Sequence, residues 1–384
     1  MIPYGKQDIT QEDIDRVIEV LKSDFITQGP EIPRFEQSLC EYTGANHAVA
    51  VNSATSALHI ACLALGLGDG DYMWTSPNTF VASANCGLYC GARLDFVDID
   101  PDSYNMSVEL LEKKLEIAEA EGKLPKVVIP VHFAGQSCNM KAIRQLADKY
   151  AFKIIEDASH AIGGGYLAKP VGGCEYADIT VFSFHPVKII TTAEGGVATT
   201  NDEKIANTMQ RLRSHGVTRD PGLMQGDIEG PWYYQQVELG FNYRMTDMQA
   251  ALGHSQMQRL DGYIKSRHVI RERYDQLLSE LPVITPWQNA DSYSALHLYP
   301  VQIKDECNVD RKKVFETMRE KGIGVNVHYI PVHTQPYYRA MGFKENDFPN
   351  AVEYYRRAIS LPLFSALTEE QQNKVVDSLR ESLK

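Results

Sequence analysis

The sequence has few positive charges for its size. It carries 38 lysines and arginines against 50 aspartates and glutamates, a formal net charge of -12 at pH 7, and the basic residues form no cluster or stripe. Nucleic acids and anionic membranes are bound by such basic surfaces. The sequence therefore predicts neither a nucleic acid nor a membrane as a partner.

Long apolar runs are absent as well. No stretch approaches the roughly 20 apolar residues that cross a bilayer, and the first eight residues, MIPYGKQD, lack the apolar core of a secretion signal. Cysteine is sparse, with 7 residues and no C-x-x-C pair, which is usual where thiols stay reduced. We expect a cytoplasmic protein with free cysteines.

Several motifs that would indicate other chemistry are incomplete. Residues 66–71 resemble a dinucleotide-binding loop but lack its last glycine, which disfavours a nicotinamide oxidoreductase, and no G-x-S-x-G serine elbow occurs. Residues 98–102 begin like a calcium loop, but Ser103 stands where that loop requires glycine. His328 and His333 lack helical spacing and an acidic third ligand, so no metal site is expected.

The order of apolar segments predicts an α/β protein with two domains. With 384 residues, 43% of them hydrophobic, the chain is long enough for both. Strand and helix patterns alternate in the first two thirds, which favours a mainly parallel sheet covered by helices. We expect residues 1–250 to form an N-terminal segment and a large domain, and residues 251–384 a linking helix and a smaller α/β domain. The expected strands are 48–52, 72–75, 93–97, 126–131, 153–156, 179–184, 196–199, 297–301 and 324–327, and the expected helices are 56–65, 81–90, 108–120, 140–150, 203–215, 247–278, 310–321 and 369–383, with a long functional or interface loop over 216–243.

One lysine stands in an unusual place in this pattern. Lys188 lies on a short turn between two expected buried strands, in the segment SFHPVK (183–188), and the glycine pair of AEGG (193–196) follows it. Burial lowers the pKa of a lysine, so that its neutral amine can attack a carbonyl near neutral pH. Most lysines are simply exposed surface residues, so Lys188 indicates a site only together with other residues.

Asp157 provides the second indication. It ends the apolar run FKIIED (152–157), which predicts a buried parallel strand. A carboxylate at the carboxyl end of such a strand points into the crevice where open α/β sheets bind ligands, although an acid at this place can also cap a turn. Pyridoxal phosphate needs this combination, a lysine to hold its aldehyde as a Schiff base and an acid to keep its pyridine nitrogen protonated.

A helix that follows an early strand can supply a phosphate site. The strand over 48–52 is followed by SATSA (53–57), in which small and hydroxyl residues begin a helix. Free N–H groups and the helix dipole favour an anion at such a terminus, and Ser183 is a further candidate donor. Ordinary capping by Ser53 or Thr55 has the same pattern, so this segment permits phosphate binding without requiring it.

Taken together and in this order, the motifs resemble a known family. They are NSATSA (52–57), EDASH (156–160), SFHPVK (183–188) and AEGG (193–196), joined by TQGP (27–30), TFVA (79–82), GFNYRM (240–245) and HYIP (328–331). The chain is similar over nearly its whole length to the sugar-nucleotide aminotransferases of the DegT/StrS type, pyridoxal phosphate enzymes of the aspartate aminotransferase fold (fold type I).

The resemblance implies a role for each matched position around the cofactor. Lys188 would form the Schiff base and shuttle protons, and Asp157 would pair with the pyridine nitrogen. The other expected cofactor contacts are Phe80 against the ring, His160 near the 3-hydroxyl, where many relatives carry glutamine, and Ala54, Thr55 and Ser183 at the phosphate. Asn242 would reach the phosphate of a neighbouring subunit, which implies a homodimer with shared sites.

The resemblance also implies a substrate. The expected contacts with a sugar nucleotide are Tyr4, Asp24, Phe25, Ile26, Thr27, His328, Tyr329, Ile330 and Pro331. Within the family, the segment from Ser183 to Gly196 is most similar to the 4-aminotransferases of pseudaminic acid biosynthesis. These enzymes use L-glutamate to aminate C4 of a UDP-linked 4-keto-6-deoxy-N-acetyl-hexosamine.

Other functions remain open at this point. The same fold serves aminotransferases that act on other nucleotide-linked keto sugars, such as a GDP-perosamine-type enzyme or a dTDP 3- or 4-amino sugar enzyme. A regulator that binds the cofactor without turnover is a different class. Relatives that have become dehydratases lack the lysine, so Lys188 argues against that reaction here.

Overall fold

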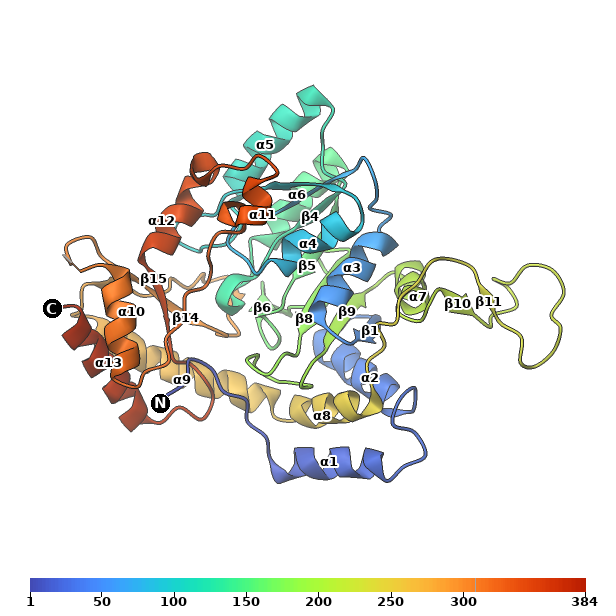
Figure 1. Cartoon of the computed structure of the whole chain (residues 1–384), viewed down its shortest axis with the longest axis horizontal. Helices are drawn as coiled ribbons and strands as arrows, with labels where there is room; N and C mark the ends of the chain where they lie inside the picture. Colours follow the sequence, from blue (N-terminus) through green and yellow to red (C-terminus); the bar gives the residue numbers. More distant parts are fainter. Residues whose placement is uncertain (308) are drawn as a thin grey trace.

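The computed structural model describes residues 1–307 and 309–384. Its centre is a seven-stranded sheet in the order β1-β9-β8-β5-β4-β2-β3 (Figure 1). Neighbours from β8 to β3 pair in parallel, and β9 alone runs antiparallel to both of its neighbours. The predicted α/β class with a mainly parallel sheet is confirmed. The strands are β1 (His47–Val51), β2 (Tyr72–Thr75), β3 (Arg93–Phe96), β4 (Val127–Ile129), β5 (Lys153–Asp157), β8 (Ile179–Ser183) and β9 (Gly196–Thr200).

Helices cover both faces of this sheet. Residues of one parity, such as Val49 and Ile155, enter a core shared with α3 (Ala54–Ala64), α4 (Ala82–Tyr89) and α7 (Glu203–Leu212). Residues of the other parity enter cores shared with α2 (Glu31–Thr43), α5 (Val108–Glu121) and α6 (Met140–Tyr150). Because successive strand side chains point to opposite faces, Asp157 lies on the α3–α4 face and Glu156 on the other.

The carboxyl ends of the parallel strands meet at one edge of the sheet. There β1 leads into α3, β2 leads into the loop before α4, and β5 and β8 end at Asp157 and Ser183. Gly196, the first residue of β9, pairs with Ser183 at the same edge. Since ligands of open α/β sheets bind outside the carboxyl ends of the strands, the candidate site is to be sought here.

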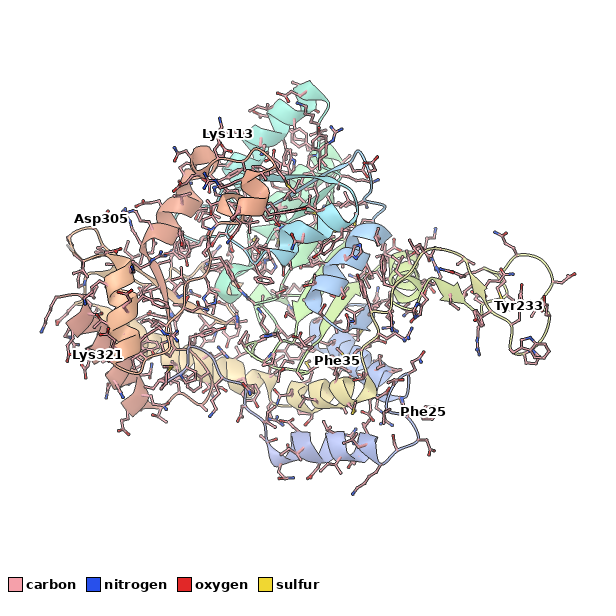
Figure 2. All side chains as sticks on the ribbon, in the orientation of Figure 1. Phe25, Phe35, Lys113, Tyr233, Asp305 and Lys321 are labelled. Atoms are coloured by element: carbon pink, nitrogen blue, oxygen red, sulfur yellow. The ribbon has the colours of Figure 1, made fainter. Side chains whose placement is uncertain are left out.

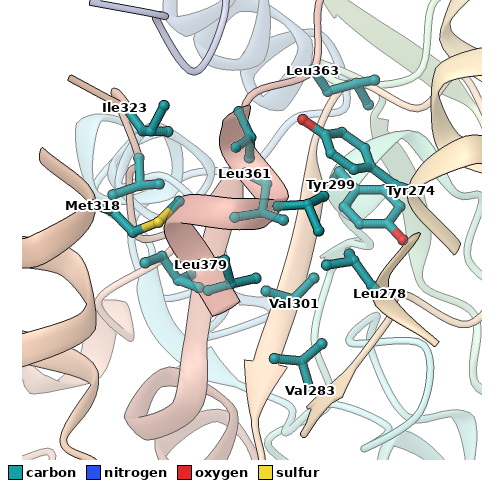
Figure 3. Close-up of a cluster of buried hydrophobic side chains, with 14 of the residues drawn as sticks. Tyr274, Leu278, Val283, Tyr299, Val301, Met318, Ile323, Leu361, Leu363 and Leu379 are labelled. Atoms are coloured by element: carbon teal, nitrogen blue, oxygen red, sulfur yellow. The ribbon is translucent and has the colours of Figure 1, made fainter. Parts of the chain in front are cut away.

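The C-terminal part has a sheet and an apolar core of its own. The sheet has the order β12 (Val283–Ile284), β14 (Tyr299–Ile303), β15 (Ala358–Leu361) and packs beside α10 (Arg311–Glu320) and α13 (Glu369–Ser382). Figure 3 shows this core, in which Tyr274, Met318 and Leu379 meet. The predicted strand over 324–327 is wrong, because only single bridges form there, at Ile323 with Ile2 and at Asn326 with Ser360.

The predicted linking helix is divided in two. It consists of α8 (Asp247–Met257) and α9 (Leu260–Leu278), and Arg259 between them leaves helical geometry with φ -110 and ψ 1. Ile264 packs into the core of the large sheet, whereas Ile270 packs into the C-terminal core. The packing partner therefore changes within α9, and the division of the chain at residue 250 stays a prediction.

Further elements were not predicted from the sequence. They include α1 (Gln11–Leu21), α2, the strands β12 and β15 of the C-terminal sheet, a sheet of β6 (Gly165–Tyr166), β7 (Lys169–Pro170) and β13 (Ser292–Tyr293), the short α11 (Pro336–Arg339), and α12 (Pro349–Arg357). In the described part of the chain, no helix combines the length and the apolar character needed to cross a bilayer.

The segment expected to be a long loop, residues 216–243, forms an arm that projects from the body (Figure 1). It contains a short antiparallel pair, β10 (Val217–Thr218) and β11 (Gln235–Gln236), and Figure 2 labels Tyr233 on its outer part. Its exposed apolar side chains are Leu223, Ile228, Trp232, Tyr234, Val237 and Leu239. Several exposed apolar side chains on a projecting segment are a feature of surfaces that bind another protein.

Candidate active site

Asp157 is held at the end of β5 by a buried hydrogen-bond network. The side chain is 4% exposed. Ser83 Oγ on α4 donates to Asp157 Oδ2 at 2.6 Å, and Ser159 N donates to Oδ1 at 3.1 Å. Thr79 Oγ1 lies 2.7 Å from Ser83 Oγ. A buried carboxylate requires such donors, so the first turn of α4 and the backbone after β5 fix the direction in which Asp157 points.

Lys188 lies between the buried strands β8 and β9, as predicted, but on a connection over residues 184–195 that is longer than the short turn expected. Thr192 N and Thr191 Oγ1 both donate to Phe184 O, at 2.9 Å each, and Lys188 N donates to His185 O at 2.9 Å. Burial lowers the pKa of Lys188 to about 8, while the negative charge of Asp157 acts in the opposite direction. A substantial neutral fraction near neutral pH therefore gives this amine the reactivity expected of a nucleophile.

The start of α3 lies against β9 at the same edge. Ser53 caps the helix by accepting from Ser56 N at 3.1 Å, and the N–H groups of Ala54 and Thr55 belong to the first turn, which has no carbonyl partners within the helix. A Cβ at Gly196 would lie 2.4 Å from Ala54 N, so only glycine allows this approach. Ser183, paired with Gly196, thus stands beside the helix terminus and can join it in binding an anion.

His160, three residues after Asp157, joins the large domain to the C-terminal part. Its Nε2 lies 3.0 Å from the hydroxyl of Tyr329, and Tyr329 N donates to Asn78 Oδ1 at 3.3 Å. Burial, reinforced by the nearby Lys188, lowers the pKa of His160 and lowers the pKa of His328 to about 3. Both histidines are therefore neutral at physiological pH.

The segment 328–331 and Tyr4 lie together at this junction. The rings of Tyr4 and His328 are 5.4 Å apart, and His328 Nδ1 lies 2.8 Å from Ser360 Oγ. Ile330 is 48% exposed and Phe80, in the loop before α4, is 60% exposed, whereas Pro331 is buried. Exposed apolar side chains beside a buried polar cluster are suited to contact a ligand.

Two groups of predicted residues lie elsewhere in the same chain. Residues 24–27 are exposed and pack on the start of α8, where Ile26 O accepts from Asp247 N at 3.1 Å, and Figure 2 shows Phe25 at the periphery of the molecule. Asn242 is exposed at the base of the arm, where it pairs with Ser214. No hydrogen bond described for the chain joins either group to Lys188.

Sequence analysis missed several residues that support the site. Thr79 lies in the loop before α4 and Ser83 on its first turn, so their contact depends on the shape of this loop and gave no clear signal in the sequence. Asn78 and His297 gave no signal of their own. His297 lies at the start of an expected strand, and only the packing of the C-terminal part brings its ring to within 4.4 Å of His160.

The donor set suits pyridoxal phosphate. Asp157, fixed by Ser83, is a partner for a pyridine nitrogen, and the nearby Lys188, with its lowered pKa, is a partner for an aldehyde. The helix terminus beside Ser183 is a partner for a phosphate. The sheet order and this set of side chains define the class as the pyridoxal phosphate enzymes of fold type I.

Within that class, the chain belongs to the DegT/DnrJ/EryC1/StrS aminotransferase family, whose model matches residues 7–380. The spore coat polysaccharide biosynthesis protein SpsC of Bacillus subtilis is 38% identical over 100% of this chain and 97% of its own length. The UDP-4-amino-4,6-dideoxy-N-acetyl-beta-L-altrosamine transaminase of Campylobacter jejuni is 37% identical over 99% of this chain and 96% of its own.

Solved structures agree with this assignment. Helicobacter pylori PseC, an aminotransferase involved in the biosynthesis of pseudoaminic acid, superposes with a TM-score of 0.90 at 31% identity and covers 100% of this chain and 99% of its own. The putative sugar aminotransferase Spr1654 of Streptococcus pneumoniae in its PLP form gives 0.90 at 29%, covering 100% and 98%. The protein is thus a pyridoxal phosphate-dependent aminotransferase, as its sequence predicted.

Proposed function

We propose that this enzyme transfers the amino group of L-glutamate to C4 of a UDP-linked 4-keto-6-deoxy-N-acetyl-hexosamine, forming UDP-4-amino-4,6-dideoxy-N-acetyl-L-altrosamine for pseudaminic acid biosynthesis. The observation that carries amino transfer is the lysine of lowered pKa near the hydrogen-bonded Asp157. The sugar is supported by the names of the Campylobacter and Helicobacter relatives. We place the reaction in the cytoplasm, since the cysteines found in the described residues are free.

In this proposal the chain supplies the positions and the protons. Ala54, Thr55 and Ser183 bind the phosphate, Phe80 lies against the ring, and His160 lies near its 3-hydroxyl. Asp157 holds a proton at the pyridine nitrogen. Pyridoxal phosphate, when bound, accepts the electron pair that is left when a bond to the reacting carbon breaks.

Lys188 has two tasks. It holds the cofactor covalently between turnovers, and once it is displaced by the substrate amine it takes the proton from Cα of glutamate. In the second half of the reaction it gives a proton to C4 of the sugar. A pKa of about 8 suits both directions, because neither protonation state of the amine is scarce near neutral pH.

The proposed substrate contacts are Tyr4, residues 24–27 and residues 328–331. Tyr4 and His328 lie together beside the site, so they can bind the sugar in the chain that carries Lys188. Residues 24–27 connect to the site only indirectly, through α8, where Gln249 Nε2 donates to Glu194 O at 2.7 Å. Their exposure fits a role in an assembly of two chains.

We therefore include a homodimer with shared active sites in the proposal. The exposed apolar side chains of the arm need a partner surface, and Asn242 stands at the base of that arm. A second copy of the chain that binds the arm would receive Asn242 at its own phosphate site. A two-fold axis makes this exchange reciprocal.

Shared sites predict that two defective chains will complement each other. We co-express Lys188→Ala and Asn242→Asp with different tags and purify all the resulting dimers together. About a quarter of wild-type activity should return, because half of the random dimers contain one chain of each variant and each of these has one intact site. Aspartate at position 242 repels the phosphate in the other site. Glutamate-dependent amination is the measurement.

A matched pair controls this result. Lys188→Ala co-expressed with the double variant Lys188→Ala, Asn242→Asp has no intact site in any dimer and is expected to stay inactive. If mixed dimers are verified by their two tags and their activity equals the mean of the separate variants, Asn242 acts within its own chain and the shared site is wrong.

The substrate is tested with a panel of UDP-, GDP- and dTDP-linked 4-keto sugars and glutamate. We expect the UDP-linked N-acetyl sugar to have the highest kcat/KM, and NMR of the product to show the new amine at C4. A higher kcat/KM with a GDP or dTDP sugar would establish the alternative, an aminotransferase of another nucleotide sugar. The relation to SpsC, named for a spore coat polysaccharide, keeps that alternative in the panel.

A further inference from the structure

His297 is a buried residue outside the proposed cofactor and substrate contacts, and it packs against His160. The two ring centroids are 4.4 Å apart at an interplanar angle of 44°, with His297 4% and His160 5% exposed. The backbone beside His297 is fixed, because Ala295 N donates to Gly135 O at 2.9 Å and Arg267 Nη1 donates to His297 O at 3.3 Å. His297 therefore has a defined position relative to the candidate site.

Both histidines have an unsatisfied nitrogen. Among the described residues, neither His160 Nδ1 nor His297 Nδ1 has a hydrogen-bond partner, whereas His160 Nε2 lies 3.0 Å from the Tyr329 hydroxyl. Buried polar atoms are nearly always hydrogen-bonded, to protein or to a trapped water. Neighbouring imidazole rings can satisfy such nitrogens when one carries a proton and the other is bare, directly or through a trapped water molecule.

The charges around the pair keep both rings neutral. Burial lowers the pKa of both histidines, and Lys188 lowers them further. Arg267 adds a buried positive charge, since the hydrogen bonds described for its side chain go to the carbonyls of Leu296, His297 and Leu363 and none goes to a carboxylate. A neutral imidazole carries one N–H. If the nitrogen of one ring that faces the other ring carries the proton, the facing nitrogen of the other ring must be a bare acceptor.

Tyr329 and His297 lie at opposite ends of His160. His160 Nε2 is the partner described for the Tyr329 hydroxyl, and burial raises the pKa of Tyr329, so the hydroxyl keeps its proton. When this hydroxyl donates to a bare Nε2, the proton of His160 is on Nδ1. A bare Nδ1 of His297 is then its nearby acceptor, with the proton of His297 on Nε2.

We propose that His297 is a positioning residue, the last member of a relay Tyr329–His160–His297 that fixes the ring orientation and the Nδ1–H tautomer of His160. The effect on turnover rests on the proposed function, in which His160 lies near the 3-hydroxyl of the cofactor ring. The tautomer of His160 does not depend on the proposed function, because it is a property of the protein without cofactor.

The test compares His297→Asn with His297→Phe by 15N NMR of the side-chain nitrogens in cofactor-free protein. Asparagine keeps a polar atom near the place of Nδ1, and phenylalanine keeps the ring shape without it. In the wild type and in His297→Asn we expect His160 to be the Nδ1–H tautomer. In His297→Phe we expect a mixture of both tautomers and a kcat reduced about tenfold, the lower end of the loss seen when a metal-bound histidine loses its outer partner.

Tyr329→Phe provides a second variant that cuts the relay at its other end. It should also release His160 into a tautomer mixture, and it keeps the test decisive if His297→Phe is unstable, as thermal unfolding will show. The proposal is overturned if wild-type His160 is the Nε2–H tautomer, or if the folded variants leave its tautomer unchanged. Because these measurements need no turnover, they stand apart from any failure of the proposed substrate.

Discussion

A Lys188→Ala variant will fold and bind pyridoxal phosphate but will lose amino transfer from glutamate. The proton transfers that we assign to this amine supply on the order of 10²–10⁴-fold in rate, and loss of the covalent attachment adds to the effect. Alanine removes a half-buried side chain from a turn that Phe184 and Thr192 hold through the backbone, so the fold should survive. The measurement is 2-oxoglutarate formed in a single turnover of the glutamate half-reaction.

Lys153→Ala is the matched control for this loss. Lys153 begins β5, at the opposite end from Asp157, and its exposed ammonium pairs with Asp178 at 2.8 Å. Its removal should leave the rate unchanged. In cofactor-free wild-type protein, capture of pyridoxal phosphate should accelerate as pH rises through about 8, because the neutral form of Lys188 increases there. Borohydride reduction of the holoenzyme that labels another lysine, or a Lys188→Ala variant as fast as Lys153→Ala, would contradict the assignment.

The sequence predicted the central elements of the site because they depend on local patterns and on one geometric rule. Buried parallel strands are recognisable as short apolar runs, and their carboxyl ends meet at one edge of a sheet. Asp157 and Ser183 each end such a run, so they could be placed together without knowledge of the strand order. Lys188 follows on the next turn, where Asp157 influences its pKa.

Contacts between distant segments could not be predicted in this way. His297 reaches His160, and Tyr329 reaches Asn78, only because the C-terminal part packs on the large sheet. Its strands are short, and Ile2, from the other end of the chain, helps to fill its core. The strand expected over 324–327 failed for the same reason, since an apolar run that packs against another segment does not need a ladder of its own.

The break between α8 and α9 illustrates a third limit. The polar and apolar pattern continues through Gln258 and Arg259, and neither residue is a helix breaker, so one helix was expected. Arg259 Nη2 instead donates to the buried Asp13 on α1 at 2.6 Å. This tertiary ion pair favours a bend that no local propensity indicates.

An Asp157→Asn variant will also lose amino transfer, through charge rather than through a covalent bond. A nearby opposite charge shifts a pKa by roughly 1–3 units, so loss of the carboxylate lowers the protonated fraction at the pyridine nitrogen, and with it the rate, about 10- to 10³-fold. The amide oxygen can still accept from Ser159 N, and the amide NH2 can donate to Ser83 Oγ, which should preserve the fold. Stopped-flow measurement of the glutamate half-reaction gives the rate.

Glu156→Gln is the control that separates this role from the general effect of a buried acid. Glu156 precedes Asp157 on β5 but faces the other side of the sheet, where it accepts from Thr180 Oγ1 at 2.6 Å. Burial raises its pKa to about 7, so at pH 6 glutamine replaces a carboxyl that is already mostly protonated, and the rate should not change.

The pH dependence of Asp157→Asn distinguishes a lost charge from a damaged site. As the pH falls, protons from solution increasingly occupy the pyridine nitrogen without help from Asp157, so the rate of the variant relative to the wild type at the same pH should rise. A variant that is well folded but equally impaired at every pH would show that Asp157 acts through its hydrogen bonds to Ser83 and Ser159 and not through its charge. Equal losses in Asp157→Asn and Glu156→Gln would assign the effect to β5 as a whole, since the two side chains lie on opposite faces of the sheet.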